Sequence, residues 1–136
     1  MFHATDLARN QQAAVQCDNF FDFIHLPDIY YSVLWRREVT RHAYKKALRI
    51  CRSFTRRNIF FDVEFKLGNG NKLYCSEFCA EVLNAAGINK QPFYPIHKNI
   101  DEPLVRAYLE SDTLLYYPVD FFQEDSLFRK VFEARK

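Results

Sequence analysis

Apolar residues recur at helical spacing in two long segments of the chain. Residues 40–54 carry one stripe, made of Ala43, Ala47, Ile50, Cys51 and Phe54. Residues 73–86 carry another, made of Phe78, Cys79, Val82, Leu83 and Ala86. Apolar positions three and four residues apart are typical of a helix that buries one face. Thr40 is suited to cap the first segment and Gly87 to end the second, so both are predicted to be helices.

Three further segments predict helices. The first covers 18–26, where Asp18 or Asn19 is suited to cap the start. The second is a short helix over 104–109. The third covers the end of the chain, 121–135, with an inward face made of Phe122, Leu127, Phe128 and Phe132.

The remaining segments predict strands, a turn and a loop. Aromatic and β-branched residues at 29–35 and 114–117 favour strands. Residues 58–67 alternate only in part and are followed by a turn over 68–71, where Gly68 and Gly70 lie close together. Residues 91–103 hold three prolines and are expected to form a loop.

These elements do not alternate in βαβ order, which favours the α+β class. We expect a small antiparallel sheet with helices packed on it. The 136 residues fit a single domain, residues 1–136, and 49% hydrophobic and 17% aromatic residues suffice for a core. The chain has only 3 glycines and contains neither G-x-G-x-x-G nor G-x-x-x-x-G-K-[ST], which excludes phosphate-binding loops of those types.

Positive charge is concentrated in the segment 36–57. It holds nine lysines and arginines against one acid, Glu38, although the whole chain carries a net charge of only +2. On the predicted helix the basic residues form a stripe made of Arg41, Lys45, Arg49, Arg52 and Arg56. Such a stripe can bind nucleic acid, anionic lipid or an acidic protein, and we expect an anionic surface rather than nucleic acid. It can equally be a solvated helix face whose long side chains cover part of the core.

Neither a signal peptide nor a membrane span is predicted. No stretch approaches the roughly 20 apolar residues that cross a bilayer. The first residues also lack a basic region followed by an apolar run. These observations leave the cellular compartment open.

Cys75 is the strongest candidate for a catalytic nucleophile, because it falls where an extended segment enters the helix predicted over 73–86. Unpaired backbone N–H groups and the positive end of the helix dipole favour a thiolate there. The same N–H groups can stabilise an oxyanion during acyl transfer. The alternative is a small buried cysteine. A zinc site shared with Cys79 and with His97 or Cys17 is a further alternative, but there is no C-x-x-C pair.

A thiolate nucleophile requires an imidazole base and a group that orients it. The chain has four histidines: His3, His25, His42 and His97. Local sequence marks none of them as the base, since members of a catalytic triad meet only in the fold.

Around Cys75 the sequence resembles a known family. The run Tyr-Cys-Ser-Glu-Phe from Tyr74 to Phe78, preceded by Phe-Asp-Val-Glu-Phe from Phe61 to Phe65, resembles the C-terminal half of the circularly permuted NlpC-type cysteine hydrolases (YiiX-like). These proteins have a papain-like fold. Further pieces agree in order and together extend the resemblance over most of the chain: Phe2 to Thr5, Asn19 to Ile24, Val33 to Arg37, and Tyr117 to Asp120.

The resemblance implies hydrolysis of an amide bond in a peptide or a cell-wall peptide, through an acyl-enzyme on Cys75. Relatives of the lecithin:retinol acyltransferase type act on lipid acyl groups. His3 matches the third, polar member of the triad, which orients the imidazole. Tyr74, Ser76 and Glu77 would bind substrate or shape the site. No cofactor or metal is implied.

One part of the family pattern is missing from this sequence. The catalytic histidine of the family lies one strand earlier, and no such strand precedes His3. We therefore expect the domain to be incomplete at its N-terminus. The alternatives are that the chain is an inactive relative, that another histidine serves as the base, or that the chain is a non-enzymatic module that binds anionic partners through the basic helix 40–57.

Overall fold

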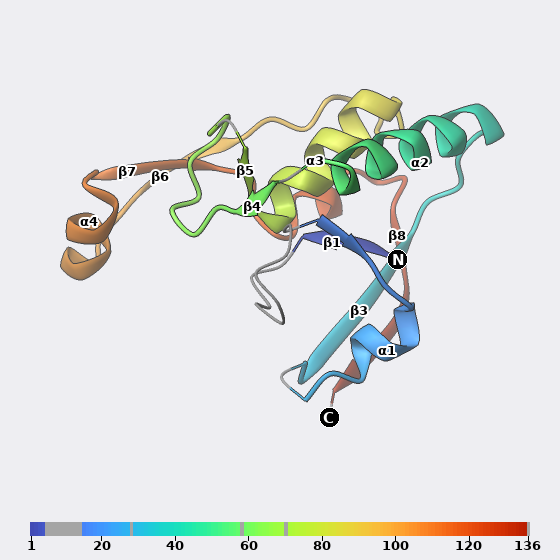
Figure 1. The fold of residues 1–136 in the computed structure, drawn as a ribbon, viewed down its shortest axis with the longest axis horizontal. Coiled ribbons are helices and arrows are strands. Elements are labelled where there is room, and N and C mark those ends of the chain that lie inside the picture. Colours follow the sequence, from blue (N-terminus) through green and yellow to red (C-terminus); the bar gives the residue numbers. More distant parts are fainter. Residues whose placement is uncertain (5–14, 28, 58, 70, 136) are drawn as a thin grey trace.

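The computed structural model describes residues 1–4, 15–27, 29–57, 59–69 and 71–135 (Figure 1). Thr5, Asn58 and Gly70, which belong to segments discussed above, lie outside the described residues. The described chain mixes helices with small, mostly antiparallel sheets, which confirms the α+β class.

Two long helices form the centre of the molecule. Helix α2 (Arg41–Thr55) and helix α3 (Cys75–Ala86) pack side by side over the hairpin of β1 (Phe2–Ala4) and β2 (Val15–Cys17) (Figure 1). Their ends confirm the sequence signals. The Thr40 hydroxyl accepts a hydrogen bond from the Ala43 N–H at 3.2 Å, and Gly87 ends α3 with a left-handed φ of 67°.

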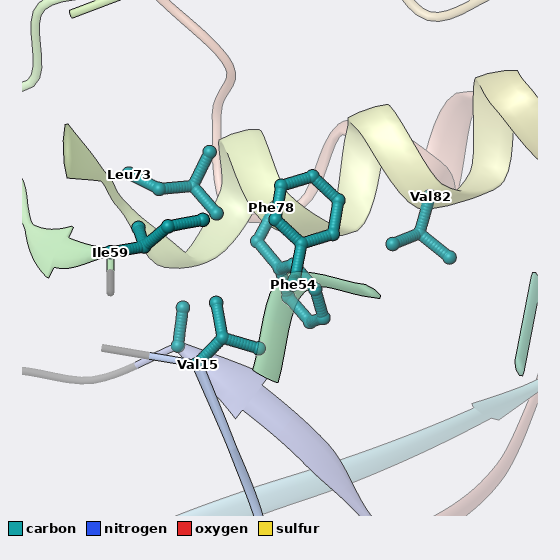
Figure 2. Packing of buried hydrophobic residues seen from close by; sticks show 7 residues of the cluster. Val15, Phe54, Ile59, Leu73, Phe78 and Val82 are labelled. Carbon is teal, nitrogen blue, oxygen red and sulfur yellow. The ribbon is translucent and has the colours of Figure 1, made fainter. Parts of the chain in front are cut away.

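The core lies between these two helices and the hairpin. It is a cluster made of Ala4, Val15, Phe54, Ile59, Leu73, Phe78 and Val82. Figure 2 shows Phe54 of α2 meeting Phe78 of α3, and the two rings are edge to face with centroids 5.5 Å apart. Ala47, Ile50 and Cys51 of α2 pack against this cluster, which confirms the apolar stripe read from the sequence.

The other elements lie outside this centre. They are α1 (Phe20–Ile24), β3 (Tyr31–Arg36), β4 (Phe60–Phe61), β5 (Lys72–Leu73), β6 (Ile96–Asn99), α4 (Pro103–Leu109), β7 (Thr113–Tyr116), the 3-10 helix η1 (Phe121–Glu124) and β8 (Arg129–Arg135). The pairs β3–β8 and β6–β7 are antiparallel and β4–β5 is parallel. Asn19, one of the two expected caps, begins α1 by accepting the Phe21 N–H at 2.9 Å.

The helix predicted over 121–135 is wrong. Residues 121–124 form only η1, and residues 129–135 form β8, which pairs with β3. Leu127, which precedes β8, and Phe132 within it are about half exposed. Asp125 ends η1, because its Oδ1 accepts the Leu127 N–H at 2.9 Å in an Asx turn. The Asp125 Oδ2 also accepts from Arg37 Nη1 at 2.8 Å and from the Lys90 N–H at 2.9 Å. These bonds fix a turn where the apolar spacing predicted a helix.

Two smaller expectations also change. The segment 91–103, expected to be a loop, contains β6, because β7 offers it an antiparallel partner. Cys79, expected in the core stripe of α3, is exposed, whereas Phe78, Val82 and Ala86 are buried.

Replacing Phe78 with Ala is expected to lower the free energy of unfolding by about 3–5 kcal/mol, because the cavity would open at the contact between α2 and α3. Chemical denaturation followed by circular dichroism measures this change. Phe60→Ala is the matched control: Phe60 is half exposed, so its loss should cost much less. Equal losses for the two variants would contradict the position assigned to the core.

Candidate functional site

Cys75 is the first residue of α3, as its position after an extended segment predicts. Tyr74, in extended conformation, precedes the helix and makes no side-chain capping bond. The first helical bond runs from the Phe78 N–H to the Tyr74 carbonyl at 3.0 Å. The N–H groups of Cys75, Ser76 and Glu77 therefore have no partner within the helix backbone. Cys75 is a half-buried free thiol packed against the edge of the core cluster.

The residues on either side of Cys75 hold a distant segment of the chain. The Tyr74 Oη accepts a hydrogen bond from the Tyr117 N–H at 2.9 Å, and the Ser76 Oγ donates to the Tyr117 carbonyl at 2.6 Å. Tyr74 is only 1% exposed, and burial raises its pKa. Because both side chains are buried and bonded to backbone, they fix the position of Cys75 and present little surface to a ligand.

A loop organised by Asp62 lies beside Tyr74. Asp62 is 0% exposed, and its two carboxylate oxygens accept the N–H groups of Glu64 and Lys66, each at 3.0 Å. The loop brings the Phe65 ring to 5.3 Å from the Tyr74 ring, with Phe65 in a left-handed conformation (φ 54°). This role of Asp62 was not predicted from the sequence, although aspartate at the head of a turn is a known signal.

Glu77 ties the same loop to α3. Its Oε1 accepts the Gly68 N–H at 3.2 Å, while Oε2 has no hydrogen-bond partner among the described residues. The residue is 3% exposed, and burial raises the pKa of its carboxyl group. Glu77 therefore contributes to the shape of this region from inside the protein.

His3 is hydrogen-bonded to the carboxylate of Asp18, a partner that was not predicted from the sequence. Its Nε2 lies 2.7 Å from Asp18 Oδ2, its ring packs 4.6 Å from that of Phe23, and its Nδ1 is buried with no partner among the described residues. Side chains alternate along a strand, and Phe2 and Ala4 face the core cluster that Cys75 contacts. His3 thus points to the opposite face of the β1–β2 hairpin, toward α1.

Among the described contacts, the other three histidines do not reach Cys75 either. His25 ends α1, and its Nδ1 is 2.6 Å from the Phe21 carbonyl, which it caps. His42 on α2 and His97 on β6 are exposed. No hydrogen bond joins a histidine to Cys75 within the described ranges.

The described residues do not offer a zinc site of the kind considered from the sequence. No group of three or more histidine, cysteine, aspartate or glutamate side chains is arranged there to hold a metal ion.

The basic stripe is present as a surface. All five members are exposed: Arg41, Lys45, Arg49 and Arg52 on α2, and Arg56 at its C-terminal cap. Across the part of the chain that the structure describes, none of them forms an ion pair. We call these five residues the basic face.

Comparisons of the chain with protein-family models, with curated proteins and with solved structures find no match. As for membrane insertion, no helix among the described residues has the length and apolar character that a bilayer span requires.

Glu77→Gln is expected to remove a pH dependence of stability. Burial raises the folded-state pKa of Glu77, so the folded protein binds this proton more tightly than the unfolded chain. The stability of the original chain relative to the variant should therefore fall as the pH rises above about 4.3, the ordinary glutamate pKa. Urea unfolding of both proteins from about pH 4 to pH 8 measures the difference.

Glu64→Gln is the matched control. A hydrogen bond from Lys66, at 2.9 Å, and the charge of that lysine lower the pKa of Glu64. The original chain should gain stability relative to this variant as the pH rises, which is the opposite direction. Parallel unfolding curves for the original chain and Glu77→Gln would contradict the account of Glu77.

Proposed function

We propose that this chain is a thiol hydrolase of the permuted papain-like, NlpC-type class and that Cys75 is its nucleophile. The observation that carries the proposal is a free, half-buried thiol at the first position of α3, between two side chains bonded to Tyr117. The family resemblance around Tyr74 to Phe78 supports the same assignment. The substrate class is an amide in a peptide or a cell-wall peptide.

The reaction follows from the position of the thiol. The Cys75 Sγ attacks the amide carbon, and the negative charge that develops on the carbonyl oxygen is stabilised by N–H groups of the first turn of α3. The C–N bond of the tetrahedral intermediate then breaks. The amine leaves with the proton that the Cys75 thiol gave up to a base, and a thioester remains on Sγ. Water then attacks the thioester, which releases the carboxylic acid and restores the thiol.

Rigid support of the nucleophile favours this chemistry. The Tyr117 backbone, held by Tyr74 and Ser76, and the Glu77–Gly68 bond limit how far the start of α3 can shift. A nucleophile held in one orientation loses less freedom when it meets its substrate.

The second candidate is an inactive relative of the same class, and the orientation of His3 is the observation that favours it. In the proposed hydrolase, His3 would orient the imidazole that takes the proton from Cys75. In the structure, His3 binds Asp18 on the far face of the β1–β2 hairpin. The two candidates differ in whether Cys75 turns over an acyl group once a base is available.

The test uses p-nitrophenyl acetate as the acyl donor and free imidazole as an added base. The hydrolase predicts an acetyl group on Cys75, found by peptide mass spectrometry, and turnover that imidazole raises about tenfold or more. Cys75→Ser should lose this gain, and it also measures the background reaction of imidazole alone. Hydrolysis of an amide library then identifies the substrate.

Cys17→Ser and Cys79→Ser are the matched controls, since both cysteines are exposed. They should keep the full rate. Acetylation of Cys17 or Cys79 in preference to Cys75 would overturn the assignment of the nucleophile. A stable acetyl-Cys75 that imidazole does not turn over would favour the inactive relative.

A further inference from the structure

The segment from β6 through α4 to β7, residues 96–116, forms an arm that extends from the body of the molecule (Figure 1). Only one residue of α4, Leu109, is buried. Leu104 is 79% exposed and Tyr108 is 63% exposed, and they lie four positions apart on one side of the helix. A helix exposed in this way leaves an apolar face without a partner within the described molecule.

The tip of this arm is acidic. Residues 101–112 carry four acids, Asp101, Glu102, Glu110 and Asp112, against one base, Arg106. Asp101 and Glu102 are exposed at the start of α4 and form no ion pair with any described residue. The apolar face of α4 is therefore bordered by unpaired negative charge.

The basic face of α2 has the complementary character. Residues 41–57 contain seven lysines and arginines and no acid. Tyr44, which is also strongly exposed, lies three positions from Arg41 and so is its neighbour on the surface of the same helix. An aromatic ring and the aliphatic stems of the basic side chains offer apolar surface between the charges.

We propose that the arm of one molecule docks through α4 on the basic face of α2 in a second copy of this chain. Figure 1 places α4 and α2 at opposite sides of the molecule along its longest axis, so the arm does not reach its own α2. Asp101 and Glu102 meet basic side chains of the second copy, and Leu104 and Tyr108 cover Tyr44. Reciprocal docking gives a closed dimer, and one-way docking gives a growing chain of molecules.

Exposed ion pairs are weak individually and are screened by salt. The association is therefore expected to be strong at low ionic strength and to weaken on addition of salt. The apolar contact of Leu104 and Tyr108 supplies the part that salt does not remove.

The experiment reverses each surface separately in the full chain. Lys45→Glu with Arg49→Glu makes the α2 face acidic, and Asp101→Lys with Glu102→Lys makes the arm basic. Sedimentation velocity over about 10–200 µM in about 20 mM salt measures self-association, which should be about tenfold weaker for either variant. An equimolar mixture of the two variants should associate as the original chain does, because both of its contacts are again complementary.

Asp22→Lys is the matched control, because it reverses one acidic residue in the first turn of α1. It should associate normally, and circular dichroism confirms that every variant is folded. A monomeric original chain at low salt would overturn the proposal, as would a mixture of the two variants that stays monomeric. Retention of a monomeric chain on heparin, lost in Lys45→Glu with Arg49→Glu, would instead assign the basic face to a polyanion.

Discussion

The backbone of Tyr117 is bonded on both sides to the residues that flank Cys75. Its N–H donates to Tyr74 and its carbonyl accepts from Ser76. These two bonds connect the end of β7 to the start of α3, and they hold the thiol between two immobilised neighbours. Each bond forms inside the protein, so losing either would leave a buried polar group unpaired. The position of Cys75 therefore depends on a segment more than forty residues further along the chain.

Burial of polar groups is the common feature around this contact. Asp62, Ser76 and Glu77 are all buried, and each is bonded to backbone rather than to a cation. Such bonds define one geometry for the loop after β4 and for the first turn of α3. The proposed chemistry at Cys75 uses this rigidity, whereas the proposed docking of α4 uses a helix of which only Leu109 is buried.

Local sequence signals were sufficient to predict the features that depend on interactions between nearby residues. Thr40 and Gly87 mark helix ends because each makes a bond or a backbone conformation within a few residues. The placement of Cys75 at the start of α3 follows from the same kind of signal. The apolar spacing at 121–135 predicted a helix that does not form, because Asp125 forms a turn and β8 pairs with β3.

Contacts between distant segments could not be read from the sequence. The partner of His3 is Asp18, and the face on which His3 lies depends on how the β1–β2 hairpin packs on α3. Strand alternation alone allows either face to be buried. The hydrogen bonds to the Tyr117 backbone are equally non-local, since only the fold brings the end of β7 to Tyr74.

The pairing of β3 with β8 has a consequence for the order of assembly. The Tyr31 hydroxyl bonds Glu133 at 2.7 Å across 102 positions of sequence. Closing a loop of this size costs conformational entropy before any contact repays it. During synthesis, β3 remains without its β8 partner until residues 129–135 have been made, whereas α2 and α3 can already be packed together. Because contacts of high sequence separation form slowly, we expect the central helices to pack before the outer sheet.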